Sequence, residues 1–412
     1  MGSVGIAVPE TIEDVGVRRN LLEDLALKIL YMQGELSLVE LAKQMHLSLA
    51  IVEDLFERLR KGQLCEVKGM VGVVHRITTT SQGRARALEL LAMSQYWGPA
   101  PVSLDDYVSR VRAQSVRDAE VHPDDVRRAF QHLVLPEKTL DQLGTAMVSG
   151  RSIFLYGPPG TGKTAIAETL PQIYNDEVWI PHAVDVDGQI IAVYDPHLHE
   201  SAGELAWSDG DGRWVRCRRP RVLAGGELTL EMLDLQFNPI TKFYAAPLQM
   251  KANNGVLIVD DFGRQRMRPQ ELLNRWIVPL DRRIDFLTLA GGKKFEMPFD
   301  LFVVFSTNLD PRELADEAFL RRIQTKIKVD YVTPEQFDEI SRRVCVEFGL
   351  DCDIGIIEEL RSVLSRHKQP LRACYPRDII QHLRWAARYE GQQPQVSLAA
   401  VEEACRSYFL ST

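Results

Sequence analysis

Apolar residues near the start of the chain recur every three or four positions, which is the spacing of one face of a helix. Two short runs rich in β-branched residues follow. The predicted elements are helices over 18–31, 38–45 and 48–61 and strands over 64–67 and 73–78. Ser37 can cap the second helix, and Ser48 can start the third. Three helices and a hairpin predict a winged helix-turn-helix domain over 18–95, behind a flexible arm over 1–17.

Short buried strands alternate with helices in the middle of the chain, which predicts an α/β fold. The strands are expected over 152–156, 178–180, 256–259 and 301–305. A region rich in Gly and Asp separates the second and third strands and predicts a β-rich insert of about 181–225. Before the last strand, residues 286–297 carry a Gly-rich turn between two β-like flanks, which predicts a hairpin.

The other segments of the chain are mostly helical. A Gly-Pro-Ala-Pro sequence predicts a stiff linker, followed by a helical connector, over 96–132. From residue 333 onward, apolar residues keep helical spacing with breaks between four segments. We expect these helices to form a small domain over 331–412, behind a large α/β domain over 133–330.

The loop after the strand over 152–156 matches the phosphate-binding pattern G-x-x-x-x-G-K-[ST]. Its residues are Gly157, Pro158, Pro159, Gly160, Thr161, Gly162, Lys163 and Thr164. The glycines allow a tight turn whose N–H groups face a chain of phosphates. Lys163 is placed to reach the β- and γ-phosphates of ATP, and the Thr164 hydroxyl to bind Mg²⁺. A helix over 164–170, stopped by Pro171, adds the positive end of its dipole.

Polar side chains follow the later strands of the predicted sheet. Asp260 and Asp261 come directly after the strand over 256–259. We expect Asp260 to hold Mg²⁺ through water and Asp261 to polarise the attacking water. Asn308 follows the strand over 301–305, at the rim where α/β sheets bind ligands, and its amide can orient the same water.

Composition excludes several classes of protein. The 412 residues are 45% hydrophobic and 26% charged, which is enough to build more than one core. The net charge of −8 argues mildly against a protein that binds nucleic acid along its whole surface. Six scattered cysteines without a C-x-x-C pair suit reduced thiols, and no run of eighteen apolar residues occurs. We therefore expect a cytoplasmic protein without membrane insertion.

Some residue groups allow both a functional and a structural interpretation. Trp207, Trp214, Phe243 and Tyr244 can contact a substrate or belong to the core. The basic group Arg216, Arg218, Arg219 and Arg221 can bind an acidic partner or cover a solvated sheet face. The run from His197 to Glu200 has metal-ligand residue types at a spacing that suits one helix face poorly, so no metal is expected there. Cys345 and Cys352 are expected to be core thiols.

The predicted winged helix invites a DNA-binding interpretation. Its third helix, which would enter the groove, carries Glu53, Asp54 and Glu57 beside its basic residues. Acidic and basic residues are equal in number from residue 18 to 69, whereas a DNA reader usually shows a basic footprint. Docking of a protein partner is therefore favoured over DNA binding.

Taken in order, these motifs resemble those of the AAA+ ATPases over residues 133–412. In that resemblance, the phosphate loop is Walker A and Val256–Asp261 is Walker B. Asn308 resembles sensor 1, Arg322 or else Arg321 the arginine finger, and Arg377 sensor 2. The hairpin before the sensor 1 strand resembles that of MoxR-like branches. The N-terminal winged helix, with Arg216–Asp234 and Asp260–Leu280, resembles predicted bacterial ATPases described as chaperone-like and pilus-associated. The resemblance implies a three-layer αβα core with a helical lid.

The same resemblance implies a ring, often a hexamer, with ATP and Mg²⁺ at subunit interfaces and the finger supplied by a neighbour. This chain departs from the family in one place, since Walker B usually ends in Asp-Glu and here ends in Asp260-Asp261. The shorter side chain sets the catalytic carboxylate about 1.5 Å further back. The leading hypothesis is an ATPase that remodels or assembles a protein partner. The alternatives are a DNA-dependent ATPase and a nucleotide-gated scaffold with slow hydrolysis.

Overall fold

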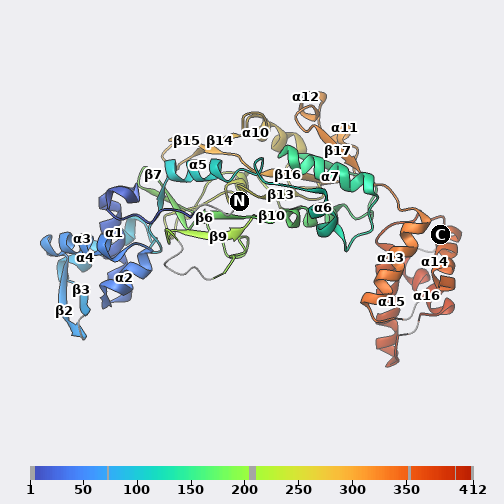
Figure 1. Ribbon diagram of the computed structural model, residues 1–412, viewed down its shortest axis with the longest axis horizontal. Coiled ribbons are helices and arrows are strands. Elements are labelled where there is room, and N and C mark those ends of the chain that lie inside the picture. Colours follow the sequence, from blue (N-terminus) through green and yellow to red (C-terminus); the bar gives the residue numbers. More distant parts are fainter. Residues whose placement is uncertain (1–4, 72–73, 204–209, 351–353, 395, 410–412) are drawn as a thin grey trace.

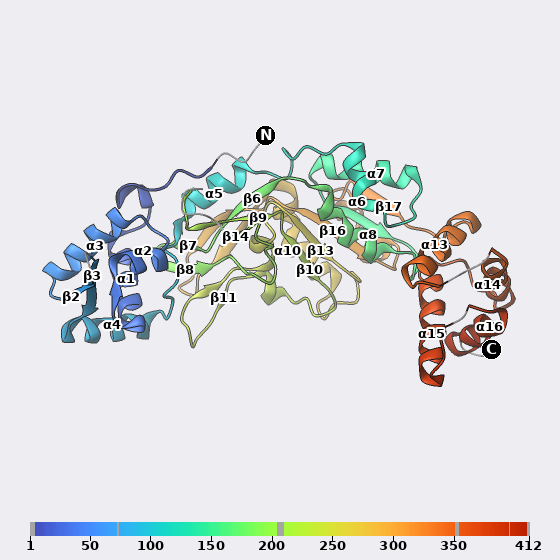
Figure 2. The ribbon, with the colours of Figure 1, turned by 60° about the horizontal axis from the view of Figure 1, so that its bottom comes forward.

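The computed structural model describes residues 5–71, 74–203, 210–350, 354–394 and 396–409. Figure 1 shows an elongated molecule with a group of helices and a hairpin at one end, a sheet-containing core in the middle and a helical bundle at the other end. Figure 2, a second view, shows the same three parts in the same order.

The N-terminal unit contains the helices and hairpin that the sequence predicts. Its elements are η1 (Glu13–Val15), α1 (Arg19–Gln33), β1 (Leu36–Ser37), α2 (Leu38–Met45), α3 (Leu49–Lys61), β2 (Cys65–Val71), β3 (Val74–Thr79) and α4 (Ser81–Met93). The strands form a three-stranded antiparallel sheet in the order β1-β3-β2. Ser37 caps α2 in a capping box with Glu40. Ser48 is the N-cap residue of α3, so the predicted start of this helix is confirmed, although the Ser48 hydroxyl makes no capping hydrogen bond.

The central parallel sheet has five strands in the order β10-β13-β16-β5-β17. Its elements and covering helices are α6 (Pro123–Phe130), α7 (Glu137–Ser149), β5 (Ile153–Tyr156), α8 (Lys163–Thr169), η2 (Leu170–Ile173), β10 (Arg221–Ala224), β13 (Val256–Val259), α10 (Pro269–Arg282), β16 (Phe302–Thr307), α11 (Pro311–Leu314), α12 (Glu317–Leu320) and β17 (Thr325–Lys328). Two apolar clusters cover its two faces. This confirms an α/β P-loop domain with a parallel sheet and helices.

One strand assignment is wrong. The strand predicted over 178–180 exists as β6 (Glu177–Pro181), but it pairs antiparallel with β9 (Trp214–Arg218) outside the parallel sheet. The strand beside β13 is β10, which lies inside the predicted insert of 181–225. As the edge strand, β10 alternates exposed and buried residues, so it lacks the continuous apolar run that marks a buried parallel strand.

The β-rich insert draws strands from a longer stretch of chain than predicted. It contains β4 (Val102–Ser103), β7 (Ala183–Val186), β8 (Gln189–Ala192), β11 (Gln236–Phe237) and β12 (Tyr244–Ala245) in one sheet of order β11-β12-β8-β7-β4. Beside it lie α5 (Leu104–Ala113), η3 (Leu230–Leu233), α9 (Leu248–Lys251) and the predicted hairpin of β14 (Ile284–Thr288) and β15 (Lys294–Pro298). These strands are short and partly exposed, which weakens their sequence signal.

The N-terminal unit packs directly on the insert. Ala183 and Ile190 of the insert are part of the same buried cluster as the N-terminal helices. The buried Arg213 pairs with Asp211 at 2.7 Å and donates to the carbonyl of Val15, also at 2.7 Å. The unit is therefore in direct contact with the insert through both apolar packing and buried hydrogen bonds.

The C-terminal bundle consists of α13 (Pro334–Glu347), α14 (Ile354–Arg366), α15 (Tyr375–Glu390) and α16 (Leu398–Tyr408). These correspond to the predicted helices, and Ser397 caps the last of them. Phe337, Leu364 and Ile379 are fully buried among them. The bundle thus has a core of its own, and its proposed limits of 331–412 stay a prediction.

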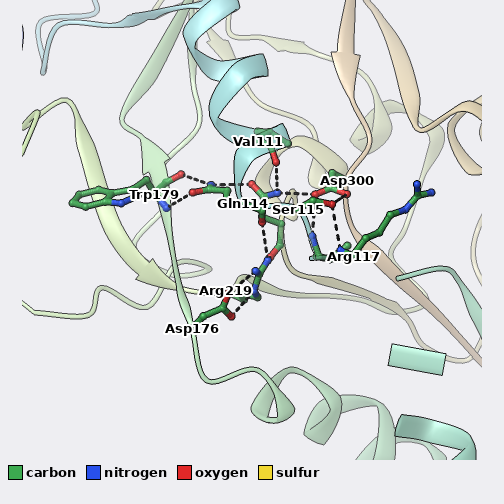
Figure 3. Close-up of polar contacts among 10 residues, drawn as sticks. Val111, Gln114, Ser115, Arg117, Asp176, Trp179, Arg219 and Asp300 are labelled. Atoms are coloured by element: carbon green, nitrogen blue, oxygen red, sulfur yellow. Dashed lines mark hydrogen bonds and ion pairs between the residues drawn. The ribbon is translucent and has the colours of Figure 1, made fainter. Parts of the chain in front are cut away.

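A buried polar network joins the connector, the insert and the parallel sheet (Figure 3). Gln114 Nε2 donates to the Trp179 carbonyl at 2.8 Å and to Asn254 Oδ1 at 2.9 Å. Asn254 Nδ2 donates to Asp300 Oδ2 at 2.8 Å. Arg219 Nη1 donates to the carbonyls of Gln114 and Asn254 at 3.0 and 2.8 Å. Since Asn254 and Asp300 lie just before β13 and β16, the network fixes where these strands begin.

Arg219→Ala is expected to lower the free energy of unfolding by about 2–4 kcal/mol, because two carbonyls lose their donors and the 2.5 Å ion pair with Asp176 is lost. The side chain of Arg219 is 3% exposed, whereas that of Arg218 is 72% exposed and lies 3.5 Å from Glu200. Arg218→Ala is the matched control and should cost about 0.5 kcal/mol or less. Urea unfolding compares the two variants, and equal losses would contradict a structural role for the network.

Candidate functional site

A cavity of about 650 Å³ lies at the carboxyl ends of the parallel strands. Its walls come from the phosphate loop, the ends of β13 and β16, the segment 132–136 before α7, and helices α13 and α15 of the bundle. Most of the predicted site residues line it, namely Pro159, Gly160, Thr161, Gly162, Lys163, Thr164, Asp261, Asn308 and Arg377. Pockets of this volume hold nucleotide-sized ligands.

The glycines of the phosphate loop adopt the conformations that the motif predicts. Gly157, Gly160 and Gly162 have φ angles of 144°, 76° and 95°. A Cβ on Gly157 would lie 2.2 Å from the Val329 carbonyl oxygen, and one on Gly160 would lie 2.7 Å from Cys374 Sγ. Gly157 is therefore held against β17, and Gly160 against the bundle.

Lys163 is buried at the base of the loop. Its Nζ donates to the carbonyls of Gly157 at 2.9 Å and Pro158 at 2.7 Å. Burial lowers the pKa of the Lys163 ammonium group, and the nearby carboxylates of Asp261 and Asp260 oppose this shift. The two carboxylates thus help to keep a desolvated lysine protonated, as a phosphate-binding cation requires.

Thr164 and Asp260 meet above the sheet. The Thr164 hydroxyl donates to Asp260 Oδ2 at 2.9 Å, although the residues are far apart in sequence. Both offer oxygen atoms, and Mg²⁺ in nucleotide sites usually takes one or two protein oxygens besides phosphate and water. Within the described residues there is no group of three or more His, Cys, Asp or Glu that suits a metal. The Thr164–Asp260 pair therefore fits Mg²⁺ bound together with a phosphate ligand.

Asp261 and Asn308 form the second polar pair. Asn308 Nδ2 donates to Asp261 Oδ1 at 3.1 Å, so the two sequence-predicted residues lie together. The backbone of Asp261 is left-handed with φ of 48°, and the next residue, Phe262, donates its N–H to the Ser306 carbonyl at 2.7 Å. Gln265, which sequence reasoning missed, donates to the Asp260 carbonyl at 2.8 Å. This turn aims the Asp261 carboxylate towards the cavity.

Arg377 lies on α15 and lines the cavity from the side of the bundle. Its guanidinium group pairs with Glu347, with Nη1 donating at 3.0 Å. The bundle also touches the phosphate loop directly, because Cys374 donates its N–H to the Gly160 carbonyl at 3.1 Å. Arg377 thus lines the same cavity as the phosphate loop, and Glu347 holds its guanidinium group.

Arg322 lies away from the cavity. It follows α12 and forms an ion pair with Asp281 at 2.7 Å, near the amino end of β17. Arg321 is exposed beside it. The structure therefore brings together Lys163, Asp261, Asn308 and Arg377 but leaves both finger candidates at the opposite edge of the sheet.

An apolar wall was not assigned from the sequence alone. Leu133, Val134 and Leu135, before α7, face the cavity together with Ile340 and Val344 of α13. Arg343 ties the two sides together, donating from Nη1 to the Gln131 carbonyl at 2.8 Å. No local motif marks these residues, since the wall forms only when the bundle folds against the segment before α7.

Other residue groups have structural explanations. His199 is buried, with Nδ1 accepting from the Asp195 N–H at 2.9 Å and Nε2 lying 2.8 Å from the Lys251 carbonyl, so neither nitrogen is open to a metal. Trp214 and Tyr244 are core residues, Phe243 packs partly buried, and Trp207 lies outside the described residues. Cys345 is buried, and Cys352 also lies outside the described residues.

The predicted basic group does not form one patch. Arg219 is buried in the polar network, Arg216 pairs with Glu177 at 3.0 Å, and Arg218 pairs with Glu200 at 3.5 Å. Arg221 Nη1 reaches the Glu168 carbonyl at 3.5 Å. Arg216 and Arg218 share one face of β9, whereas Arg219 is buried beyond the end of that strand and Arg221 begins β10 after Pro220, so the sequence run does not correspond to one surface.

Comparison with known proteins gives partial matches. A family model described as a domain of unknown function, DUF8689, matches residues 333–407, within the C-terminal bundle. A vesicle-fusing ATPase of Caenorhabditis elegans is 36% identical over 91 residues, which is 22% of this chain and 10% of that protein. The vesicular-fusion protein SEC18 of Saccharomyces cerevisiae is 45% identical over 49 residues, 12% of this chain and 6% of that protein. The chain thus spans a tenth or less of these relatives.

Solved structures give looser likenesses. The Thermotoga maritima RuvB Holliday junction branch migration motor covers 71% of this chain and 72% of its own length, at 14% identity and a TM-score of 0.37. The FIGL-1 AAA domain covers 74% of this chain and 89% of its own length, at 16% identity and a TM-score of 0.36. The sequence matches to vesicle-fusing ATPases support an AAA+ ATPase fold for the core, whereas the MoxR-like branch stays a prediction. No helix among the described residues has the length and apolarity to cross a membrane.

Gly157→Ala is expected to weaken ATP binding at least about tenfold, because a Cβ 2.2 Å from the Val329 carbonyl forces the phosphate loop to move. Gly188 also has a positive φ, of 82°, but a Cβ there meets no atom within 4 Å. Gly188→Ala is therefore the control for backbone strain alone and should leave the dissociation constant unchanged. Equilibrium binding of a fluorescent ATP analogue compares them, and unchanged binding in Gly157→Ala would contradict the assignment of this loop.

Proposed function

We propose that the protein is a Mg²⁺-dependent AAA+ ATPase whose nucleotide site is the cavity between the parallel sheet and the C-terminal bundle. The observation that carries the proposal is the convergence of two polar pairs, Thr164 with Asp260 and Asp261 with Asn308, beside Lys163. These side chains come from three separate strand ends. Their meeting matches what phosphoryl transfer to water needs, namely cations at the phosphates and a carboxylate near the nucleophile.

Each side chain has a distinct role in this proposal. Lys163 leaves the loop carbonyls and binds the phosphate chain, while the loop N–H groups donate hydrogen bonds to the other phosphate oxygens. Thr164 and Asp260 would hold Mg²⁺, which neutralises charge on the phosphates when bound. Asp261 receives a proton from the attacking water, and Asn308 holds the Asp261 carboxylate in place through the 3.1 Å hydrogen bond. The apolar wall of Leu133 and Val344 accommodates the base.

The proposed oligomer follows from the positions of Arg322 and of the nucleotide cavity, which lie at opposite ends of the parallel strands. Arg322 lies near the amino end of β17, whereas the cavity lies at the carboxyl ends of the strands. A finger there reaches a nucleotide only if the nucleotide belongs to another copy. A contact between the amino ends of the strands in one copy and the carboxyl ends in the next copy is head-to-tail, and repeated contacts of this kind can close a ring. We therefore propose a ring, of the hexameric kind that the resemblance implies, with Arg322 acting in trans.

The proposed substrate of the motor is a protein partner, docked through the N-terminal winged helix. The exposed face of α3 carries Glu53 and Asp54 as well as Arg58, which does not favour a nucleic-acid backbone. The contacts of this unit with the insert, including Arg213, provide a mechanical path from the ATPase core. Stimulation of hydrolysis by duplex DNA that falls steeply with salt would instead favour the DNA-dependent alternative.

Asp261→Asn tests the catalytic assignment. Because the amide cannot accept the proton, hydrolysis should fall by about 10²–10⁴-fold, with ATP affinity kept within about threefold. Phosphate release and equilibrium ATP binding are measured in parallel, with Lys163→Ala as the variant that loses affinity as well. Normal hydrolysis in Asp261→Asn would rule out Asp261 as the base.

Arg322→Ala is expected to lower the rate of hydrolysis by about 10³-fold while ATP binding is largely kept, since a finger acts on the transition state. Arg312→Ala is the control, because Arg312 is likewise paired with a carboxylate, Asp310, at 2.6 Å. A near-normal rate in Arg322→Ala would refute the finger assignment and direct the test to Arg321.

Changing the length of the Asp261 side chain tests whether the protein is an active motor or a nucleotide-gated scaffold with slow hydrolysis. Asp261→Glu moves the carboxylate about 1.5 Å closer to the nucleotide. If the wild type hydrolyses slowly because Asp261 is too short, Asp261→Glu should raise the rate per subunit. A lower rate in Asp261→Glu would instead show that the left-handed turn at Asp261, with φ of 48°, is adapted to the shorter residue.

A further inference from the structure

A second cavity, of about 350 Å³, lies at the amino ends of the parallel strands, on the edge of the sheet opposite the nucleotide cavity. We call it the arginine pocket. Arg151 lies just before β5, Leu301 just before β16 and Gln324 just before β17. The end of α10 closes one side.

Five arginines line this pocket, namely Arg117, Arg151, Arg283, Arg321 and Arg322. Asp281 is the one carboxylate in its lining, and it pairs with Arg322 at 2.7 Å. In the part of the chain that the structure describes, no carboxylate forms an ion pair with Arg117, Arg151 or Arg283. The pocket therefore has a large excess of positive charge.

Arg283 places part of this charge inside the fold, whereas Arg117 and Arg151 are exposed. Its Nη1 donates to the Leu301 carbonyl at 2.8 Å, whereas its Nη2 is buried without a hydrogen-bond partner. Burial, followed by the positive charge of Arg117, lowers the pKa of Arg283 to about 10. A buried guanidinium with an unused donor is costly unless an anion binds to it.

The polar network positions Arg117 at the pocket. Ser115 and Val116 bind the carboxylate of Asp300 at 2.9 and 3.1 Å, which fixes the turn after α5. Figure 3 shows the Arg117 side chain turned away from that network. A Cβ on Gly150 would lie 2.6 Å from Arg117 Cγ, so the glycine lets the arginine stem lie against the turn before β5.

We propose that the arginine pocket is a second anion site, which binds a phosphate group carrying more than one negative charge. Planar guanidinium groups suit phosphate oxygens, since each can donate two parallel hydrogen bonds. A multiply charged phosphate balances the excess better than a single carboxylate. The volume of the pocket is in the range that holds small ligands.

The phosphate can come from two sources with the same chemistry. One is the nucleotide in the cavity of a second copy, whose phosphates a head-to-tail contact would bring to this edge. The other is a free phosphate-bearing molecule that regulates the protein. The choice between these sources rests on the proposed function, but the capacity to bind phosphate does not.

Inorganic tripolyphosphate tests that capacity by isothermal titration of the full chain. The titration uses the Lys163→Ala background, in which the first cavity is weakened. Adding Arg117→Gln and Arg151→Gln should weaken the remaining binding by about tenfold or more, because charge-assisted hydrogen bonds are lost. Arg112→Gln, on exposed α5 surface outside the pocket, is the matched control and should have no effect.

Two results would overturn the proposal. The first is tripolyphosphate binding that stays within about twofold after both pocket substitutions. The second is no binding at all by the Lys163→Ala parent. Thermal unfolding of the variants checks that they are folded, which is expected because Arg117 and Arg151 are exposed.

Mixing subunits of the two kinds of variant distinguishes the sources. Lys163→Ala subunits keep the arginine pocket, and subunits with Arg117→Gln and Arg151→Gln keep the nucleotide cavity. If the phosphate belongs to a neighbour's nucleotide, the mixture should hydrolyse ATP faster than either variant alone. No gain on mixing, with tripolyphosphate binding intact, assigns the pocket to a free phosphate compound. Failure of ATP hydrolysis in the wild type would contradict the proposed function without affecting the titration.

Discussion

Parallel pairing holds β13, β16 and β5 in register, so that all three strands end at one edge of the sheet. Thr164 follows β5, Asp261 follows β13 and Asn308 follows β16, and each of them lines the same cavity. The polar network around Asn254 and Asp300 fixes where two of these strands begin. A shift of one strand would separate Thr164 from Asp260, so the site depends on the register of the sheet.

The same geometry gives the sheet two edges of different character. The carboxyl edge combines acidic side chains with a loop of backbone N–H groups, and it is covered by a bundle that contacts Gly160 directly. The amino edge carries the arginine pocket, with Arg322 at its rim. In a head-to-tail assembly, a phosphate would lie between the carboxyl ends of the strands in one copy and the amino ends of the strands in the next. Positively charged groups would then neutralise it from both sides, so the two surfaces are complementary.

The sequence places the phosphate loop, Asp260, Asp261 and Asn308 at strand ends because each follows a local pattern of a buried strand with polar residues at its end, and their roles stay a prediction. It places β10 and the insert poorly, because an edge strand such as Arg221–Ala224 and two-residue strands such as Val102–Ser103 have weak periodicity. Nothing local marks the arginine pocket, since Arg117 and Arg283 are far apart in sequence and meet only in the folded chain. The run of arginines that the sequence does show, 216–221, is dispersed because β9 ends at Arg218, Arg219 is buried and Arg221 begins β10.

The rate of ATP hydrolysis per subunit, measured across a range of protein concentrations together with particle mass by light scattering, tests the central claim most directly. If the cavity needs an arginine from another copy, the rate per subunit should rise as larger particles form and then reach a plateau. A rate per subunit that is the same for monomers and for assembled particles would contradict the account.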